Sequence, residues 1–178
     1  ALFVICVVSG GVLGLVYNAT KDPIAAAEKA KKTEAIKNVL PEFKELKDVN
    51  VKSAMEDVEL PFHLAYDANG NFIGAAVETF TNKGFSGNIS LMVGILADGT
   101  VNNISVLQHA ETPGLGSKMS EPSFKDQFNN KHADSFNFNV KKDGGDVDAI
   151  TAATISSRAF CDAVNRAIST FENNKGGF

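Results

Sequence analysis

The chain contains 178 residues and has a formal net charge of -4 at pH 7. This length is enough for one well-buried domain and short for two. Because its lysines alternate with acidic residues, the chain has no basic stripe of the kind that binds a phosphate backbone, so we expect no nucleic-acid partner. The two cysteines, Cys6 and Cys161, are far apart and form no CxxC motif. We interpret both as apolar packing residues.

The chain starts with an uncharged apolar segment. No charged residue occurs between Ala1 and Tyr17, and a run of this length is at the lower limit of what spans a bilayer. We therefore predict a transmembrane anchor over residues 1–19, and we expect it to be N-terminally incomplete because the first residue is not Met. A cleaved signal peptide is the alternative, although the residues that follow offer only a poor cleavage site. Gly10 and Gly14 would let another membrane helix pack closely.

A second helical segment is predicted over residues 20–46, as a stalk between the membrane and the folded domain. Asp22 can cap a helix start, Pro23 suits the first helical position, and the alanines and lysines that follow favour helix. Pro41 ends this pattern. Taken alone, the lysines after the span would place the domain in the cytoplasm. The positive-inside rule compares both flanks of a span, however, so composition leaves the orientation open.

Residues 47–178 are predicted to form one α+β domain of antiparallel hairpins packed with helices. Alternating segments on either side of a turn at 67–70 predict a first hairpin over residues 62–80. A second hairpin is predicted over residues 89–107. The residues between them, 81–88, are typical of a glycine-containing loop that tolerates a ligand close to its backbone.

The C-terminal part of the domain is predicted to contain a short helix at 121–128, a strand at 136–140 and a long last helix. The last helix is the clearest element, because apolar residues recur at helical spacing and form one buried face: Phe160, Ala163, Val164, Ala167, Ile168 and Phe171. Four polar positions are left for solvent: Arg158, Asp162, Asn165 and Arg166.

The last helix follows a segment rich in hydroxyl residues, which reads VDAITAATISSRAF at 147–160. A helix start needs one hydroxyl cap, and Thr154 or Ser156 could provide it. The pattern exceeds this need, because Thr151 and Thr154 flank two alanines and leave room for a bulky group. The amides of residues 155–157 would be free to bind an anion at the positive end of the helix. A phosphate bonded to the Thr154 hydroxyl would lie at that end.

Two stretches of the chain resemble a known family. DAITAATISS resembles the flavinylation motif of the FMN-binding domain family, in which an aspartate precedes an [S/T]-G-A-[T/S] core and the last hydroxyl residue carries FMN through a phosphoester bond. HAETPGLGSKM is similar to a second stretch, found near the flavin in the G subunit of the Rnf complex and in the C subunit of the sodium-pumping NADH:quinone oxidoreductase. The order of the two stretches and the short chain resemble the Rnf G subunit more closely.

The resemblance implies that Thr154 carries covalent FMN and that a separate, metal-dependent flavin transferase makes the bond from FAD, with Asp148 assisting. Thr112 and the amides around Gly114 and Leu115 are implied to line the flavin ring. No residue is given a catalytic role, because a threonine hydroxyl needs activation and the motif contains no His or Lys base. The predicted cofactor-binding residues are Thr154, Asp148, Thr151, Ala152, Ala153, Ile155, Ser156, Glu111, Thr112, Gly114 and Leu115.

Ala152 departs from the family pattern, because it stands where the family usually has glycine. If that position has a positive φ, an alanine costs roughly 1 kcal/mol or more in backbone strain. The hydroxyl of the attachment residue remains, so the assignment of Thr154 stands.

Neither a metal site nor a nucleotide-binding phosphate loop is predicted. His109 and Glu111 could supply two metal ligands, but the chain has no HExxH or CxxC spacing. The ETPGLG stretch alone is typical of a tight turn. GLGSK, at 114–118, lacks the glycine spacing and the strand-loop-helix setting of a phosphate loop.

The leading hypothesis is an electron-carrier subunit of a redox-driven translocase. The resemblance implies a single-pass protein of the cell membrane, with its FMN domain outside the cytoplasm and other membrane subunits of an Rnf-type complex as partners. Such a complex couples electron transfer between ferredoxin and NAD+ to ion movement. One alternative is a free-standing anchored flavoprotein that reduces quinone or another extracytoplasmic acceptor. The other is an anchored binding module without a redox role, in which the hydroxyl cluster is only a helix cap.

Overall fold

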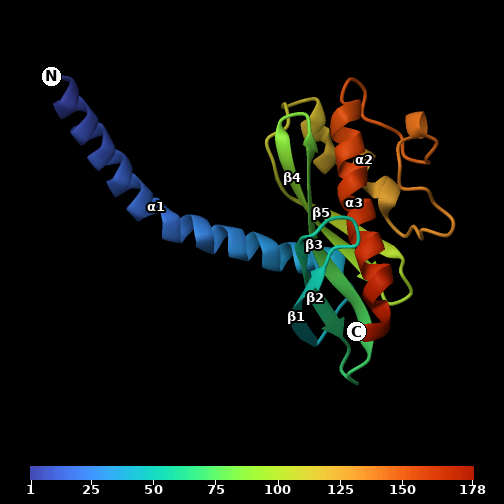
Figure 1. The fold of residues 1–178 in the computed structure, drawn as a ribbon. Coiled ribbons are helices and arrows are strands. Elements are labelled where there is room, and N and C mark those ends of the chain that lie inside the picture. The colour runs from blue at the N-terminus through green and yellow to red at the C-terminus, as the bar shows by residue number, and fades with distance from the viewer. The chain divides into compact units, whose positions relative to one another are not determined.

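The computed structural model describes all 178 residues. By its contacts the chain divides into two units, Ala1–Glu34 and Ala35–Phe178, which are described separately here. The first unit consists of most of one helix. The second unit is the α+β domain that the sequence predicts: a five-stranded antiparallel sheet packed with helices (Figure 1).

Helix α1 extends over Leu2–Val39 without a break, so it joins the predicted anchor to most of the helix predicted over residues 20–46. Residues 40–46 are not helical, and the last two of them begin β1. Pro23 lies inside this helix instead of at a helix start. A proline in a helix loses one backbone hydrogen bond, and the alanine-rich residues on its C-terminal side are strong helix formers that continue the helix. An 18-residue window of α1 has a mean hydropathy of 2.1, so this helix is long and apolar enough to cross a membrane.

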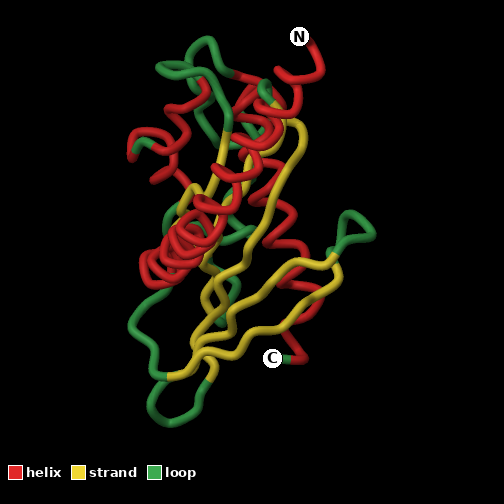
Figure 2. Tube along the Cα trace, turned by 90° about the vertical axis from the view of Figure 1, so that its left-hand side faces the viewer, coloured by secondary structure: helices red, strands yellow, loops and turns green.

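The sheet is a simple meander in which each strand pairs with the next one along the chain. Its strands are β1 (Glu45–Lys52), β2 (Glu59–Tyr66), β3 (Phe72–Gly84), β4 (Gly87–Leu96) and β5 (Val101–His109). Both predicted hairpins are confirmed, as β2 with β3 and as β4 with β5. In Figure 2 the strands, drawn as yellow tubes, run next to one another through the domain.

Residues 81–88, predicted as a loop, belong mostly to strands, and this prediction is wrong. Strands β3 and β4 pair as far as Gly84 and Gly87, so only Phe85 and Ser86 form the turn between them. The polar residues of this segment give no hydrophobic alternation, because the end of a two-stranded ribbon has few core contacts. Phe85 therefore lies at the tip of the β3–β4 hairpin.

Helix α3 (Thr154–Asn174) packs against one face of the sheet and completes the main core (Figure 1). All six apolar residues of its predicted buried face are buried. Arg166, which we expected in solvent, is also buried, and that expectation is wrong. Its guanidinium pairs with Glu56 at 2.8 Å and with Asp162 at 3.5 Å, and it lies over the ring of Phe80. These partners make the burial of an arginine possible.

The other face of the sheet is covered in part by the end of α1, within the second unit. Ala35, Ile36, Val39 and Leu40 form a second apolar cluster with residues of four strands: Ala65, Ala76, Met92 and Leu107. Asn102 and Asn103 on β5 donate side-chain hydrogen bonds to the carbonyl oxygens of Val39 and Asn38, at 2.8 and 3.0 Å. These bonds satisfy carbonyl groups that the end of a helix leaves free. Helix α1 ends just before Pro41, as predicted.

The chain between β5 and α3 contains little regular structure. It includes the short helix α2 (Pro122–Lys125) and several single turns, so the helix predicted at 121–128 is real but shorter. The strand predicted at 136–140 is wrong: only Val140 forms an isolated bridge, with Val147. Its alternating aromatic residues instead pack on one another, because Phe138 stacks on Phe128 in a cluster with Phe124 and Phe160.

Candidate functional site

A cavity of about 330 Å³ lies at the start of α3. Three segments that are distant in sequence enclose it: the β3–β4 turn, the loop that follows β5, and the residues around the first turn of α3. Its lining residues are Phe85, Glu111, Thr112, Leu115, Gly116, Ala152, Ala153, Thr154, Ile155 and Ser156. The two motif stretches of the sequence therefore meet at one cavity.

The first turn of α3 lies against this cavity with unpaired backbone amides. The helix begins at Thr154, and no side chain caps it, so neither Thr154 nor Ser156 serves as the cap that the alternative reading of this segment requires. The amide of Ser157 already donates to the carbonyl oxygen of Ala153 at 3.0 Å. The free amides are consequently those of residues 154–156, one position earlier than predicted. Such amides and the helix dipole together favour an anion at this end.

The hydroxyl of Ser157 shapes the turn that precedes the helix. It accepts a hydrogen bond from the amide of Ile150 at 2.9 Å and donates one to the carbonyl oxygen of Ala153 at 3.0 Å. These two bonds hold the turn formed by residues 150–153 against the helix. Thr154, at the first helical position, makes no side-chain hydrogen bond to its own helix end and is partly exposed to the cavity.

Ala152 has a φ of 60°, in the left-handed region. Asn130 is the only other residue besides glycine with a positive φ in this structure. An alanine in this region is strained by about 1–2 kcal/mol, since its Cβ approaches the neighbouring carbonyl oxygen. The sequence-based concern about the missing glycine is therefore justified by the backbone geometry.

Three exposed apolar side chains surround the cavity. Phe85 is 69% exposed, Ile155 is 50% exposed and Leu115 is 42% exposed. Each comes from a different one of the three segments. Large apolar side chains around a concave site are typical of a binding site for a flat, mostly apolar ring.

Glu111 is the only charged residue of the cavity wall, and it is 4% exposed. One of its carboxylate oxygens accepts a hydrogen bond from the amide of Ser86 at 2.9 Å, and the other accepts one from the hydroxyl of Ser156 at 2.5 Å. Ser156, which lies in the first turn of α3, is therefore committed to Glu111 and does not cap its helix.

The structure separates some of the predicted site residues from the cavity. Asp148 and Thr151 line a different hollow, together with Lys118 and Glu121. Asp148 forms an ion pair with Lys141 at 2.7 Å and is well exposed. Gly114 lines neither hollow, and its amide donates to the hydroxyl of Ser117 at 2.9 Å.

The sequence analysis names neither Phe85 nor Gly116, which both line the cavity, although it expects residues 81–88 to tolerate a ligand close to their backbone. Nothing in the local sequence around Phe85 indicates that the tip of its hairpin returns to α3. Gly116 lies within ETPGLG, so its position in a motif stretch was a usable signal.

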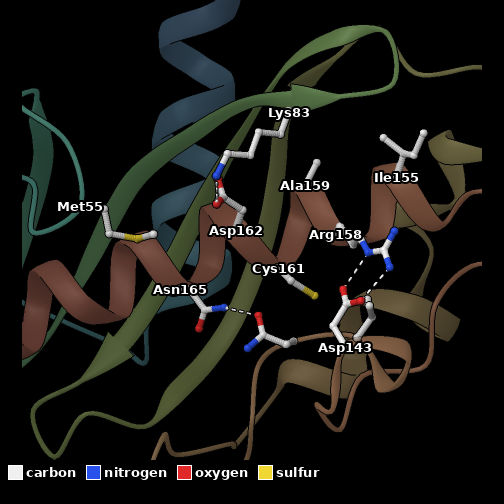
Figure 3. A pocket seen from close by; sticks show the side chains of 11 residues that line it. Met55, Lys83, Asp143, Ile155, Arg158, Ala159, Cys161, Asp162 and Asn165 are labelled. Carbon is white, nitrogen blue, oxygen red and sulfur yellow. Dashed lines mark hydrogen bonds and ion pairs between the residues drawn. The ribbon is translucent and has the colours of Figure 1, made fainter.

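A second cavity, of about 370 Å³, lies further along α3 and shares Ile155 with the first (Figure 3). Its charged side chains are matched in pairs. Arg158 donates two hydrogen bonds to the carboxylate of Asp143, both at 2.7 Å, and Lys83 pairs with Asp162 at 2.6 Å. The hydrogen bonds from Arg158 hold the pKa of Asp143 below its ordinary value.

Cys161 also lines the second cavity, and burial raises the pKa of its thiol to about 12. A thiol with so high a pKa carries almost no thiolate near neutral pH and is unreactive. The interpretation of Cys161 as a packing residue agrees with its burial. No group of three or more His, Cys, Asp or Glu residues comes together as a metal site.

Comparison with protein families identifies an FMN-binding domain at residues 84–169. This range begins at the end of β3 and contains every residue that lines the first cavity. The chain is also similar to two solved structures of the C subunit of the Na(+)-translocating NADH-quinone reductase. For the protein from Parabacteroides distasonis the TM-score is 0.58 at 22% identity, covering 84% of this chain and 83% of that one. For NqrC from Shewanella oneidensis it is 0.53 at 20% identity, covering 82% and 73%. These likenesses show that the fold is shared.

Relatives at higher identity extend over almost the whole chain. The G subunit of an ion-translocating oxidoreductase complex from Methanosarcina acetivorans is 35% identical, over 98% of this chain and 93% of its own length. The G subunit of the Na(+)-translocating ferredoxin:NAD(+) oxidoreductase complex from Acetobacterium woodii is 33% identical, over 97% and 89%. A match of this extent, together with the two motif stretches at one cavity, means that the chain belongs to the G-subunit family of ion-translocating oxidoreductase complexes and contains an FMN-binding domain.

Proposed function

We propose that Thr154 carries FMN through a phosphoester bond and that the protein is an electron carrier of a membrane-bound, ion-translocating complex. One observation supports this above all others. The side chain of Thr154 lies in the wall of the cavity, at the first position of a helix whose leading amides have no hydrogen-bond partner. A phosphate joined to this hydroxyl would receive hydrogen bonds from those amides and the favourable field of the helix dipole.

The residues of the cavity fit the rest of an FMN molecule. The apolar side chains of Phe85, Leu115 and Ile155 suit the faces and the methyl-bearing edge of the isoalloxazine ring, while Thr112 offers a hydroxyl to its polar atoms. When it is bound, FMN supplies the redox chemistry, and the protein supplies position, water exclusion and electrostatic field. Because the rim side chains are exposed, the ring would remain close to solvent and accessible to partner cofactors.

The bond to Thr154 requires a separate flavin transferase. The cavity lining includes no His or Lys that could activate the threonine hydroxyl. With FAD as the donor, the oxygen of Thr154 attacks the phosphorus on the FMN side of the pyrophosphate, the pyrophosphate bond breaks, and AMP and one proton leave. This protein is then the substrate of the transferase, and it has no catalytic residue of its own in the step.

The wider role follows from the family. The relatives are named as subunits of ion-translocating complexes, and one of them as part of a ferredoxin:NAD(+) oxidoreductase. We infer that this chain is a single-pass membrane protein anchored by α1 and that residues 1–19 span the bilayer. Residues 20–46 would lead into the domain as a stalk whose last part, from Ala35, packs on the sheet. Residues 47–178 would form the rest of the flavin domain, outside the cytoplasm. Its partners would be the other membrane subunits of an Rnf-type complex.

Three variants of the full chain test the site. With the transferase and FAD supplied, Thr154→Ala is expected to lose all covalent flavin, seen as loss of in-gel flavin fluorescence. Thr154→Ser keeps a hydroxyl and is expected to remain fluorescent. Thr151→Ala is the matched control, because Thr151 is exposed and faces the other hollow. Covalent flavin on Thr154→Ala would contradict the assignment.

Co-purification tests the wider role. A tagged copy in its native membrane is expected to retain several integral-membrane proteins in mild detergent. A flavinylated protein that purifies alone would instead support the free-standing carrier that reduces quinone or another acceptor.

A further inference from the structure

Glu111 lies where the three walls of the flavin cavity meet. Its two carboxylate oxygens accept hydrogen bonds from the Ser86 amide and from the Ser156 hydroxyl. One buried side chain therefore connects the β3–β4 turn, the loop after β5 and the first turn of α3. The relative positions of Phe85, Leu115 and Thr154 depend on this connection.

The backbone around Glu111 leaves no room for other side chains. A Cβ atom on Gly84 would approach one carboxylate oxygen of Glu111 to 2.8 Å. A Cβ atom on Gly116 would approach the other oxygen to 2.5 Å, and the Ser156 hydroxyl to the same distance. Real Cβ atoms almost never approach this closely. Gly116 thus accommodates the carboxylate, whereas the nearest obstacle to a side chain at Gly84 is the carbonyl oxygen of Gly87.

The carboxylate of Glu111 forms no ion pair with any Lys, Arg or His. Burying a carboxylate without a positive partner is costly, and two hydrogen bonds from neutral donors offset that cost only in part. The nearby N-terminus of α3 favours a negative charge at this place. A glutamine at this position would keep the shape of the side chain and remove its charge, so the two contributions of Glu111 can be separated.

We infer that Glu111 is a positioning residue whose negative charge also lowers the midpoint potential of the flavin on Thr154. The inference rests on the proposed function. Glu111 connects the walls of the cavity through Ser86 and Ser156, and its carboxylate would place a negative charge in the wall of the site where the ring would bind. This charge would oppose the addition of an electron to a bound flavin, and in a partly buried site the repulsion would be weakly screened. The reduced flavin becomes less favourable, so the flavin is a stronger reductant.

Three variants separate the charge of Glu111 from its shape. The flavinylated full chain is titrated with reductant in detergent at a fixed, mildly alkaline pH, and the midpoint potential is read from the flavin absorbance. Glu111→Gln removes the charge and keeps the shape, and is expected to shift the potential to more positive values. Glu111→Asp keeps the charge and is expected to shift it less. Ser156→Ala keeps the charge and removes a donor that disperses it, so it is expected to shift the potential to more negative values.

The outcomes distinguish this inference from the proposed function. If the wild-type chain carries no flavin on Thr154, both the proposed function and this inference are refuted. If the Glu111→Gln variant is fully flavinylated and its midpoint potential is unchanged, only the role of the charge is overturned. The same holds if the midpoint potentials of Glu111→Gln and Ser156→Ala shift in the same direction. If Glu111→Gln takes up no flavin, Ser156→Ala decides: a negative shift supports the role of the charge, and a positive shift or none overturns it.

Discussion

At the scale of single residues, Ala152 is the position where the sequence departs from the family motif and the backbone is strained. Its left-handed φ of 60° is one that glycine adopts without cost. Ala152 lies in the cavity wall, two residues before Thr154. The strain is therefore stored next to the attachment residue, where a fixed backbone helps to define the position of its hydroxyl.

Ala152→Gly is predicted to stabilise the folded protein. Release of the backbone strain raises the free energy of unfolding by about 1–2 kcal/mol. The greater freedom of glycine in the unfolded chain lowers it by about 0.4–1 kcal/mol. The expected net gain in the free energy of unfolding is on the order of 0.5 kcal/mol, measured by urea denaturation of the full chain in detergent. Ala110→Gly is the control, because Ala110 has no positive φ and should lose stability. A loss of stability in Ala152→Gly would mean that the alanine is not strained.

The site could be predicted from sequence only where residues are close together along the chain. The hydroxyl-rich segment and ETPGLG were recognisable, and the structure brings Thr154, Ser156, Glu111 and Leu115 to one cavity. The contribution of Phe85 depends on a long-range contact between a hairpin tip and a helix start. Such a contact leaves no local pattern of residues, so it was not predictable from the sequence.

At the scale of elements, the long segments with a clear hydrophobic period were predicted correctly, and most of the errors fall on short or polar segments. Helix α3 has an apolar face with helical spacing, and its six predicted core residues are all buried. Strand β1 was missed because seven of its eight residues are exposed, so it shows no clear alternation. Residues 136–140 alternate like a strand, but their phenylalanines pack into an aromatic cluster beside α3. Hydrophobic alternation indicates burial on one side, and a strand is only one way to achieve that.

Arg166 on α3 anchors the loop between β1 and β2 through its ion pair with Glu56. Arg166→Ala is predicted to lower the free energy of unfolding by about 2 kcal/mol or more. The reason is that the variant leaves Asp162 partly buried beside an empty space. The measurement is urea denaturation. Arg158→Ala is the matched control on the same helix, because its pair with Asp143 is exposed and should contribute little. Equal losses in the two variants would contradict the anchoring role of Arg166.

The effect of Arg166→Ala is predicted to depend on pH. The hydrogen bond from Arg166 lowers the pKa of Glu56. Burial acts to raise the pKa of Asp162, but hydrogen bonds from Lys83 and Thr81 outweigh it and the pKa is lowered. Carboxyl groups with a lowered pKa in the folded state contribute stability at neutral pH, and lose it as the pH falls through that lowered pKa. The penalty of Arg166→Ala should therefore shrink in acid. A constant penalty would exclude a role for the ion pairs.

The hairpin tip is predicted to shield the flavin without supporting the fold. Phe85→Ala removes a side chain that is 69% exposed, so the free energy of unfolding is expected to change by less than about 0.5 kcal/mol. Covalent flavin should still form, while quenching of the flavin fluorescence by iodide should increase because one wall of the ring site is lost. Unchanged quenching would show that Phe85 does not contact the ring. Met55→Ala is a suitable control, since Met55 is exposed and lines only the second cavity.

At the scale of the whole molecule, the chain combines a helix that is long and apolar enough to span a membrane with an FMN-binding domain. Residues 1–34 and 35–178 form separate units, and the side of the membrane comes from the family resemblance alone. Protease added to spheroplasts is predicted to digest the flavin domain, and protease added to inverted vesicles is predicted to leave it intact. The reverse pattern would place the domain in the cytoplasm, as the lysines after the span would suggest.

The most direct test of the account is the mass of the peptide that contains residues 147–158, taken from the protein purified out of its native membrane. The account predicts a mass gain equal to FMN less one water, with fragmentation placing it on Thr154. An unmodified peptide from native membranes would contradict the account, and would mean that Ala152 has disabled the motif or that the hydroxyl cluster is not a cofactor site.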